Sequence, residues 1–292
     1  MVLISFVIPF YHGNQYIKEL INCLSQINQL IMDKTGKSIE LILVNDSPEI
    51  EVKYDEKADF SVEILNNPCN LGIQASRING LQSACGEWIN FLDQDDLLFP
   101  EKYESYLKYM DQADVIISNG YYERDGEKQR IYRNIRIQNY YIQKEQLIRI
   151  RNLIPSPGES LIRKDCIPIV WKENVLDING ADDWMLWLLL HTAHARFISN
   201  PEIIYIHRAT DQGNLSNNYE KMYESCQNML SVLKRDSNFD KYDLSVLGRA
   251  IKFKYLKDTG RINATDYLKY CDCVFANIIY KFVEASGMIV GR

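Results

Sequence analysis

An abrupt change from apolar to acidic residues constrains this chain more than any other feature. Residues 88–92 read Trp-Ile-Asn-Phe-Leu, and Asp93, Asp95 and Asp96 follow within four positions. A short apolar run bounded by polar residues predicts a buried strand. Open α/β sheets bind ligands beyond the carboxyl ends of their strands. The sequence therefore predicts a strand that delivers three carboxylates to a binding edge.

The carboxylates predict a cation site. Two carboxylates about 5 Å apart repel each other by roughly 1 kcal/mol in water and roughly 3 kcal/mol at an effective dielectric constant of about 20. Mg²⁺ or Mn²⁺ suits hard oxygen ligands, takes one or two protein carboxylates and completes its shell with substrate phosphates. Asp93 and Asp95 are thus candidate metal and phosphate residues. The alternative is a solvated acidic turn that caps the helix expected after Pro100.

Three further apolar runs resemble this strand. Residues 2–10, 39–44 and 62–65 each end in polar turn residues. Helical spacing follows the first run over 17–24, and it follows the third over 73–84, where it leads into the strand at 88–92. Parallel β-α-β connectivity brings the ends of such strands to one edge of a sheet. We therefore expect an α/β fold with a mostly parallel open sheet flanked by helices.

The middle of the chain reads less regularly. Asp125-Gly126 predicts a hairpin turn into the β-rich stretch 131–137, and residues 160–163 read as an edge strand. Residues 195–198 and 203–206 read as two further strands.

The end of the chain reads as helix. Residues 184–190 are apolar nearly all round, so their helix must be buried. Amphipathic spacing then continues to Phe282. The pattern divides the chain into an α/β domain over 1–212 and a helical C-terminal region over 213–292.

Composition narrows the function. The chain is 46% hydrophobic and 25% charged, as in ordinary globular proteins, and its net charge of −6 argues against a nucleic-acid partner. Seven cysteines, an odd number without framework spacing, predict a reduced, cytoplasmic protein. The lack of a long apolar stretch predicts at most a peripheral contact with a membrane.

Five blocks, in order, resemble the signature blocks of family 2 glycosyltransferases with the A-type nucleotide-sugar fold. They are residues 4–11 (ISFVIPFY), 41–47 (LILVNDS), 70–81 (NLGIQASRINGL), 86–96 (GEWINFLDQDD) and 182–190 (DDWMLWLLL). The resemblance implies a Rossmann-like enzyme with a nucleotide-binding half at 1–96 and an acceptor half at 97–212.

The resemblance also implies a site for the donor nucleotide. Phe10 and Tyr11 would pack beside the base, and Asp46 would accept a hydrogen bond from the imide of uracil. Asn70 and Gly72 match a turn that contacts the base, where glycine permits a close approach. Loop packing and turn formation are the alternative roles for these residues.

The family places charged residues around the diphosphate. Arg77 would face the ribose and diphosphate, with a salt bridge to the acidic loop as the alternative. Asp93 would lie toward the ribose and Asp95 would bind the metal, while Asp96 would be a supporting ligand or a helix cap. Arg208 would contact a phosphate, or would simply lie in a surface loop.

Asp183 would be the catalytic base. With Asp182 it takes the place of a Glu-Asp pair at the start of the buried helix, where the helix dipole keeps carboxylates ionised. An Asp before an apolar helix is also a routine N-cap, and the two roles are compatible.

The chain departs from the family pattern at several positions. The family often has asparagine where His12 and Ile78 stand, and Thr210 stands where a histidine often follows the arginine, while His207 precedes it. These differences bear on fine contacts with the nucleotide and remove no proposed catalytic carboxylate.

The expected function is a metal-dependent inverting transfer of a hexose or hexosamine from a UDP-sugar. Mn²⁺ or Mg²⁺ would be the cofactor, and the acceptor would be a saccharide or lipid-linked saccharide of a surface polysaccharide. The alternatives are a catalytically silent sugar-binding or scaffold subunit and a nucleotidylyltransferase, although the Gly-rich opening of the latter is lacking. The C-terminal helices would serve for packing, homodimer formation or membrane docking.

Overall fold

The computed structural model describes residues 1–54, 57–208 and 218–286. The chain forms two compact units. Unit 1 comprises Met1–Ile131, Ser156–Ile167 and Arg196–Ala209, and unit 2 comprises Tyr132–Pro155, Pro168–Ala195 and Thr210–Arg292. This division differs from the one expected from the sequence, because parts of the expected acceptor half belong to each unit. The expected boundary at residue 212 lies outside the described residues.

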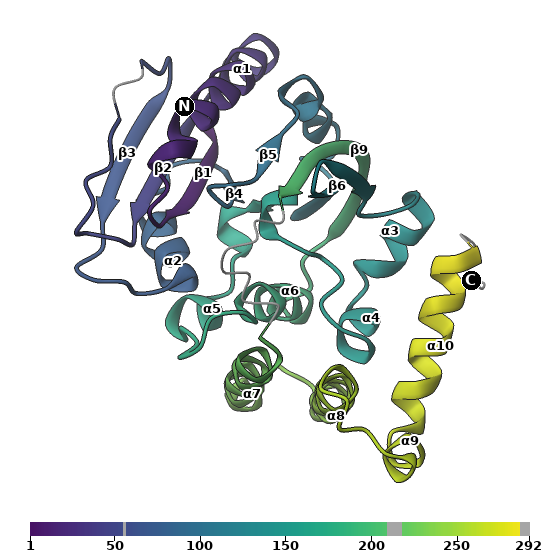
Figure 1. The fold of residues 1–292 in the computed structure, drawn as a ribbon. Coiled ribbons are helices and arrows are strands. Elements are labelled where there is room, and N and C mark those ends of the chain that lie inside the picture. Colours follow the sequence, from purple (N-terminus) through teal and green to yellow (C-terminus); the bar gives the residue numbers. More distant parts are fainter. Residues whose placement is uncertain (55–56, 209–217, 287–292) are drawn as a thin grey trace. The chain divides into compact units, whose positions relative to one another are not determined.

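Unit 1 is built on a mixed sheet, in which the described residues contribute nine strands. The strand order is β3-β2-β1-β4-β8-β6-β9-β5, and β7 pairs with β6 (Figure 1). The strands are β1 (Val2–Phe10), β2 (Ser38–Asn45), β3 (Ser61–Asn66), β4 (Trp88–Phe91), β5 (Leu97–Leu98), β6 (Val115–Arg124), β7 (Glu127–Arg130), β8 (Ser160–Arg163) and β9 (Phe197–Arg208).

The sheet changes character at β4. Strands β3, β2, β1 and β4 are all parallel, so their carboxyl ends meet at one edge. Beyond β4, the pairs β4–β8, β6–β8, β6–β7 and β5–β9 are antiparallel, and only β6–β9 is parallel among the described pairs. The open sheet flanked by helices that the sequence predicted is confirmed. The sheet is mixed, however, and not mostly parallel as expected, because continuous parallel pairing is confined to the half formed by β1 to β4.

Two helices cover opposite faces of this parallel half. Helix α1 (Ile17–Thr35) packs against the face that carries Phe6 and Ile8 of β1. Helix α2 (Ile73–Ser83) packs against the opposite face, where Gly80 meets Val7. Alternate residues of a strand point to opposite faces, which explains why β1 reads as a continuous apolar run.

Unit 1 also contains short 3-10 helices. They are η1 (Asn14–Tyr16), η2 (Pro100–Lys108), η3 (Pro157–Glu159) and η4 (Lys164–Cys166). The helix expected after Pro100 is therefore η2, with the proline in its first turn.

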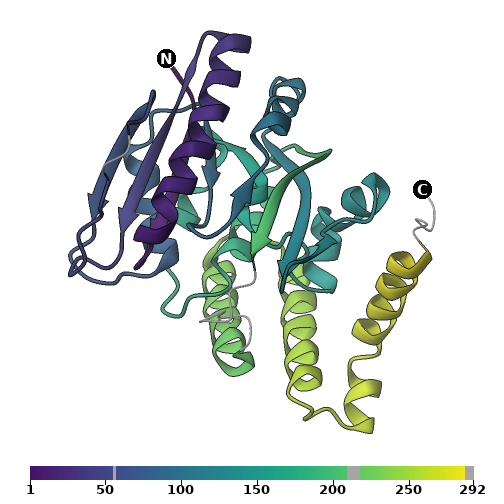
Figure 2. The same ribbon diagram turned by 45° about the horizontal axis from the view of Figure 1, so that its top comes forward.

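Unit 2 is helical throughout its described part. Its helices are α3 (Ile135–Tyr141), α4 (Lys144–Arg149), α5 (Ile169–Glu173), α6 (Asp182–Thr192), α7 (Tyr219–Arg235), α8 (Lys241–Asp258), α9 (Ala264–Lys269) and α10 (Cys271–Ser286). Helix α6 is buried from Trp184 to Leu190, as its apolar sequence predicted. Helices α7 and α8 lie side by side (Figures 1 and 2), and the rings of Tyr223 and Tyr255 stack between them with centroids 4.1 Å apart.

The hairpin at Asp125–Gly126 is confirmed, but the strand expected over residues 131–137 is wrong. Both turn residues have positive φ angles, 53° and 81°, and β7 ends at Arg130. The Asn134 side chain accepts hydrogen bonds from the amides of residues 136 and 137, both at 3.0 Å. Asn134 thereby starts α3 inside the β-rich stretch.

Two other expectations for strands need correction. Residues 160–163 form β8, which lies between β4 and β6 and is not an edge strand. Residues 195–198 and 203–206 belong largely to one strand, β9, whose pairing with β6 shifts register between Ile117 and Gly120. The shift marks an irregularity in the middle of β9, which explains why the sequence predicted two strands there.

All seven cysteines are free thiols. None of the described helices combines the length and the apolar composition that crossing a bilayer requires.

The contact between α2 and β1 predicts a steric limit at Gly80. A Cβ added at Gly80 would overlap Val7 Cγ1 and lie 3.0 Å from Val44 Cγ2. Gly80→Ala should therefore lower the free energy of unfolding by about 1–3 kcal/mol. The matched control is Gly248→Ala in α8, where the nearest atom is Leu230 Cδ1 at 3.8 Å. It should raise stability by about 0.5–1 kcal/mol. Urea denaturation of both variants tests this, and equal effects would contradict the packing.

Candidate functional site

The parallel strands deliver polar side chains to one edge of the sheet, as the sequence predicted. β1 ends at Phe10, β2 at Asn45 and β4 at Phe91, and the acidic turn Asp93–Asp96 follows β4 directly. Parallel pairing places Phe10 opposite Asn45. Loop residues after these strands can therefore converge on one ligand.

Asp46 organises the loop that precedes α2. Its carboxylate is buried and accepts hydrogen bonds from Asn67 Nδ2 (2.8 Å), Leu71 N (2.7 Å) and Gly72 N (2.9 Å). Asn70 Oδ1 also accepts from Gly72 N at 3.1 Å. The structure thus brings Asp46, Asn70 and Gly72 together, as expected. A carboxylate has about four acceptor sites, so Asp46 retains room for one further donor.

The predicted ring position splits into a buried and an exposed residue. Phe10 is buried in the core, whereas Tyr11 is 50% exposed, with its ring centroid 4.2 Å from that of His12. The exposed Tyr11 ring can therefore pack against a planar ligand, whereas the Phe10 ring anchors the loop in the hydrophobic core.

Gln94, which the sequence analysis did not single out, ties this loop to the acidic turn. Its Oε1 accepts from Tyr11 N and its Nε2 donates to Tyr11 O, both at 2.9 Å. A Cβ at Gly13 would overlap Gln94 Oε1, so the glycine makes room for the amide. The residue between Asp93 and Asp95 thus ties the backbone of Tyr11 to the acidic turn.

Arg77 contacts the first aspartate of the turn. Its buried guanidinium donates from Nη2 to Asp93 Oδ1 at 2.7 Å. Ser156 Oγ lies 3.4 Å from Asp93 Oδ2. The structure contains the ion pair that the sequence offered as the alternative role of Arg77. A contact of Arg77 with ribose or diphosphate stays a prediction.

Asp96 joins the acidic turn to the end of β9. It is 1% exposed and interacts with Tyr205 Oη, with His207 Nδ1 at 3.3 Å and with Arg208 N at 3.0 Å. Burial raises the pKa of Asp96. These partners fix the position of Asp96, and a helix cap is not among its described interactions. A role of Asp96 as a supporting ligand stays a prediction.

His207 carries a positive charge beside this carboxylate. Burial lowers its pKa, but the hydrogen bond and the charge of Asp96, with the charges of Asp93 and Asp95, outweigh burial and raise the pKa to about 9. His207 is therefore protonated at neutral pH. Tyr205 and His207 were not expected in the site. They are two positions apart on β9 and so lie on one face of the strand, and this spacing could have indicated that both reach the same site.

Asp95 is the carboxylate best suited to meet a cation. Burial, together with the smaller effect of the charges of Asp96 and Asp93, raises its pKa to about 6. Such a group loses its unfavourable electrostatic energy when a cation binds. Asp95 with Asp93 fits Mg²⁺ or Mn²⁺, which needs only one or two protein carboxylates. Among the residues that the structure describes, no three His, Cys, Asp or Glu side chains come together to hold a metal ion.

Arg208 lies against the acidic turn. Its Nε donates to the carbonyl of Asp95, its Nη2 lies 3.1 Å from Glu19 Oε2, and its guanidinium is 5.7 Å from the centroid of the Tyr16 ring. A phosphate contact by Arg208 stays a prediction. Thr210, which replaces the family's histidine, lies outside the described residues.

Asp182 and Asp183 begin helix α6 in unit 2. Asp182 is 3% exposed, whereas Asp183 is partly exposed. Asp183 Oδ2 accepts from Asn152 Nδ2 at 3.0 Å, and its Oδ1 accepts from Trp184 N at 2.6 Å. The N-cap of α6 is Ala181, so neither aspartate is the cap itself. Asn152, which orients the Asp183 carboxylate, is too far away in sequence for a local pattern to reveal it.

The sequence of this chain is similar to those of glycosyltransferases. The family model for glycosyl transferase family 2 matches residues 5–167, which is more than half of the 292 residues. An uncharacterized glycosyltransferase of Haemophilus influenzae is 33% identical over 136 residues, which are 42% of this chain and 48% of the relative. The chain thus spans about half the length of this curated relative.

Solved structures share the fold at lower identity. TarS of S. aureus, residues 1–349 in complex with UDP-GlcNAc, has a TM-score of 0.64 at 16% identity over 93% of this chain and 79% of that chain. The mannosyltransferase PcManGT from Pyrobaculum calidifontis, in complex with GDP-Man and Mn²⁺, has a TM-score of 0.54 at 13% identity over 98% and 76%. At these identities the likeness shows the shared fold alone.

The raised pKa of Asp95 predicts a stability cost of the site. Below about pH 4 the Asp95 carboxyl is protonated in both the folded and the unfolded chain, and it does not reduce the stability of the fold. As the pH rises through about 6 the folded protein must bury a charge, so the free energy of unfolding falls. Asp95→Asn should therefore be more stable than the wild type at pH 7.5, by about 1–2 kcal/mol after allowance for solvent screening.

The measurement is chemical denaturation of both proteins in metal-free buffer at pH 7.5 and pH 4. The difference should nearly vanish at pH 4. A variant that is less stable than the wild type at pH 7.5 would contradict the assigned environment of Asp95.

Proposed function

This chain belongs to glycosyl transferase family 2, and we propose that it is a metal-dependent inverting enzyme that transfers a hexose or hexosamine from a UDP-sugar. The acceptor is a hydroxyl of a saccharide or lipid-linked saccharide in the synthesis of a surface polysaccharide. The observation that carries the proposal is the turn Asp93–Asp96 at the carboxyl end of β4. There Arg77 and His207 compensate two of the carboxylates and Asp95 retains a raised pKa.

The nucleotide site supports UDP as the donor. The Tyr11 ring is exposed, and the Asp46 carboxylate has room for one further donor. A uracil offers a flat face to the ring and one imide N–H to the carboxylate. Asn70 and Gly72 present the backbone of their turn to the same base. TarS, which has the same fold, was solved with UDP-GlcNAc and with UDP, and this supports the choice of donor.

Asp95, with Asp93, would hold Mn²⁺ or Mg²⁺. When bound, the ion offsets the charge that develops on the departing nucleoside diphosphate. Mn²⁺ in the complex of PcManGT supports this choice. Arg208 would add a second positive charge to the phosphates once its contact with Glu19 opens. Asp96 would position Asp95 by fixing the turn on β9.

Asp183 would act as the base. As the acceptor oxygen bonds to the anomeric carbon and the bond to the diphosphate breaks, the acceptor O–H proton passes to a carboxylate oxygen of Asp183. Asn152 and the Trp184 amide would orient that carboxylate at the N-terminus of α6, where the helix dipole favours a negative charge. Asp182 is too buried to exchange protons readily with an acceptor.

We also place the enzyme in the cytoplasm, where its seven free thiols stay reduced. The C-terminal helices would provide a homodimer contact or a peripheral membrane contact. Leu268, Phe275 and Phe282, which are exposed on α9 and α10, support such a contact.

A thermal-shift screen of nucleotide sugars with Mn²⁺ tests the proposed donor. A ligand that binds the native state raises its melting temperature by mass action. The proposal expects UDP and at least one UDP-sugar to raise the melting temperature, followed by slow release of UDP from that sugar without acceptor. Binding without any release of UDP would favour the catalytically silent subunit.

Asp183→Asn separates catalysis from binding. The amide cannot accept the proton, so the transfer rate should fall about 10²- to 10⁴-fold, while the affinity for UDP stays unchanged. Rates of UDP release with acceptor and calorimetric titration with UDP measure the two effects. Asp177→Asn, in the exposed loop before α6, is the matched control and should retain full activity. Retained turnover in Asp183→Asn would reject Asp183 as the base.

Asp95→Ala tests the metal site. Loss of this ligand should weaken UDP binding in Mn²⁺ by more than about tenfold, down to the affinity measured in a chelator. Calorimetric titration with UDP, with and without Mn²⁺, provides the comparison. Asp111→Ala, an exposed aspartate of unit 1, is the control and should keep the metal effect. A full Mn²⁺ effect in Asp95→Ala would rule out this residue as a ligand.

A further inference from the structure

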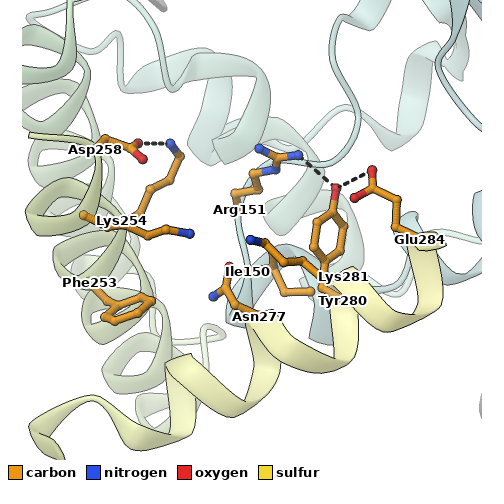
Figure 3. Close-up of a pocket in the computed structure, with 10 residues that line it drawn as sticks. Ile150, Arg151, Phe253, Lys254, Asp258, Asn277, Tyr280, Lys281 and Glu284 are labelled. Atoms are coloured by element: carbon orange, nitrogen blue, oxygen red, sulfur yellow. Dashed lines mark hydrogen bonds and ion pairs between the residues drawn. The ribbon is translucent and has the colours of Figure 1, made fainter. Parts of the chain in front are cut away.

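Unit 2 contains a pocket whose basic side chains have no part in the proposed reaction. The pocket has a volume of about 220 Å³ and is lined by α8, α10 and the residues that follow α4 (Figure 3). Its charged lining consists of Arg151, Lys254, Lys257, Lys281, Asp258 and Glu284.

The lining carries an excess of positive charge. Four cations and two carboxylates give a net charge of +2, in a chain whose net charge is −6. Both carboxylates have partners already, because Asp258 pairs with Lys254 and Glu284 accepts from Tyr280 Oη at 3.3 Å. Within the described residues, Lys257 and Lys281 have no carboxylate partner. The pocket therefore gathers positive charge that the protein itself does not neutralise.

The guanidinium of Arg151, on one wall of the pocket, is held in a fixed orientation. Arg151 Nη2 donates to Tyr280 Oη at 2.9 Å, and the guanidinium lies 5.4 Å from the centroid of the same ring. Tyr280 is buried, with its ring centroid 5.4 Å from that of Tyr141. Figure 3 shows Arg151 beside Tyr280, with Lys281 reaching from α10 toward the same space. A guanidinium has five donors, so Arg151 keeps donors for a ligand.

We infer that this pocket binds a phosphate group. An anion would remove the repulsion among the cations. A guanidinium fork combined with mobile ammonium groups suits phosphate oxygens. The volume is below the roughly 300–1,000 Å³ typical of sites for drug-sized ligands, so the pocket suits a small ion or the head of a larger molecule.

The phosphate can belong to a lipid headgroup or to a soluble molecule. Phe275, Ile278 and Phe282 are exposed on α10, the helix that also supplies Lys281. An apolar stripe beside a cationic pocket matches an amphiphile with a phosphate head. The inference goes beyond the proposed sugar transfer and does not depend on the donor site in unit 1.

The test uses the full chain and the double variant Lys257→Gln with Lys281→Gln. The control replaces Lys221 and Lys234 by Gln, because both are exposed on α7 in the same unit and the change in charge is equal. Inorganic phosphate is titrated at constant ionic strength, with the melting temperature and ³¹P NMR line width as readouts. The pocket variant should bind phosphate more weakly by on the order of tenfold, and the control should bind like the wild type.

Asp95→Ala separates this pocket from the proposed donor site. The phosphate response that depends on the lysines should survive in this variant. The melting temperature in phosphate-free buffer shows whether the lysine variants fold. If the double variant does not fold, the single variant Lys281→Gln takes its place. A response that is lost in Asp95→Ala and kept in the lysine variant would overturn the inference.

Vesicles distinguish the two sources of phosphate. The source is a lipid headgroup if the wild type and the control co-sediment with phosphatidylglycerol vesicles and the pocket variant does not. Phosphatidylcholine vesicles serve as the neutral reference. Binding of free phosphate without vesicle binding would identify a soluble ligand. If the pocket variant and the control behave alike in both experiments, the inference is wrong.

Discussion

The repulsion among the three carboxylates that follow β4 is the constraint on which the rest of the site depends. Arg77 offsets the charge of Asp93, and protonated His207 with Tyr205 offsets that of Asp96. These partners come from α2 and β9, which lie far apart in the sequence. The sheet therefore brings together the groups that hold an acidic turn in place, and Asp95 keeps an electrostatic need that a bound cation would meet.

The parallel half of the fold could be predicted because its determinants are local. Continuous apolar runs mark strands that are buried on both faces, and β1, with α1 on one face and α2 on the other, has that environment. Polar residues follow the end of each run, and Asp46 and Asp93 lie, as expected, at the edge where the parallel strands end. The hairpin at Asp125–Gly126 followed from turn chemistry in the same way.

The remainder depends on contacts between distant residues. No local pattern shows that β8 inserts between β4 and β6, or that Asn134 starts a helix within a β-rich stretch. Gln94 and Tyr205 enter the site through contacts with residues 83 and 109 positions away. Sequence alone suggested which carboxylates could act, whereas their supporting groups became visible only when the chain was folded.

The amide of Gln94 has a consequence for the engineering of this protein. It clasps both polar groups of the Tyr11 backbone, much as a neighbouring strand would. A substitution that reshapes the loop around Tyr11 to admit another nucleobase would pull on Gln94 and so move the aspartates on either side of it. In the proposed function, base preference and ion affinity would therefore be coupled, and a redesign of one would change the other.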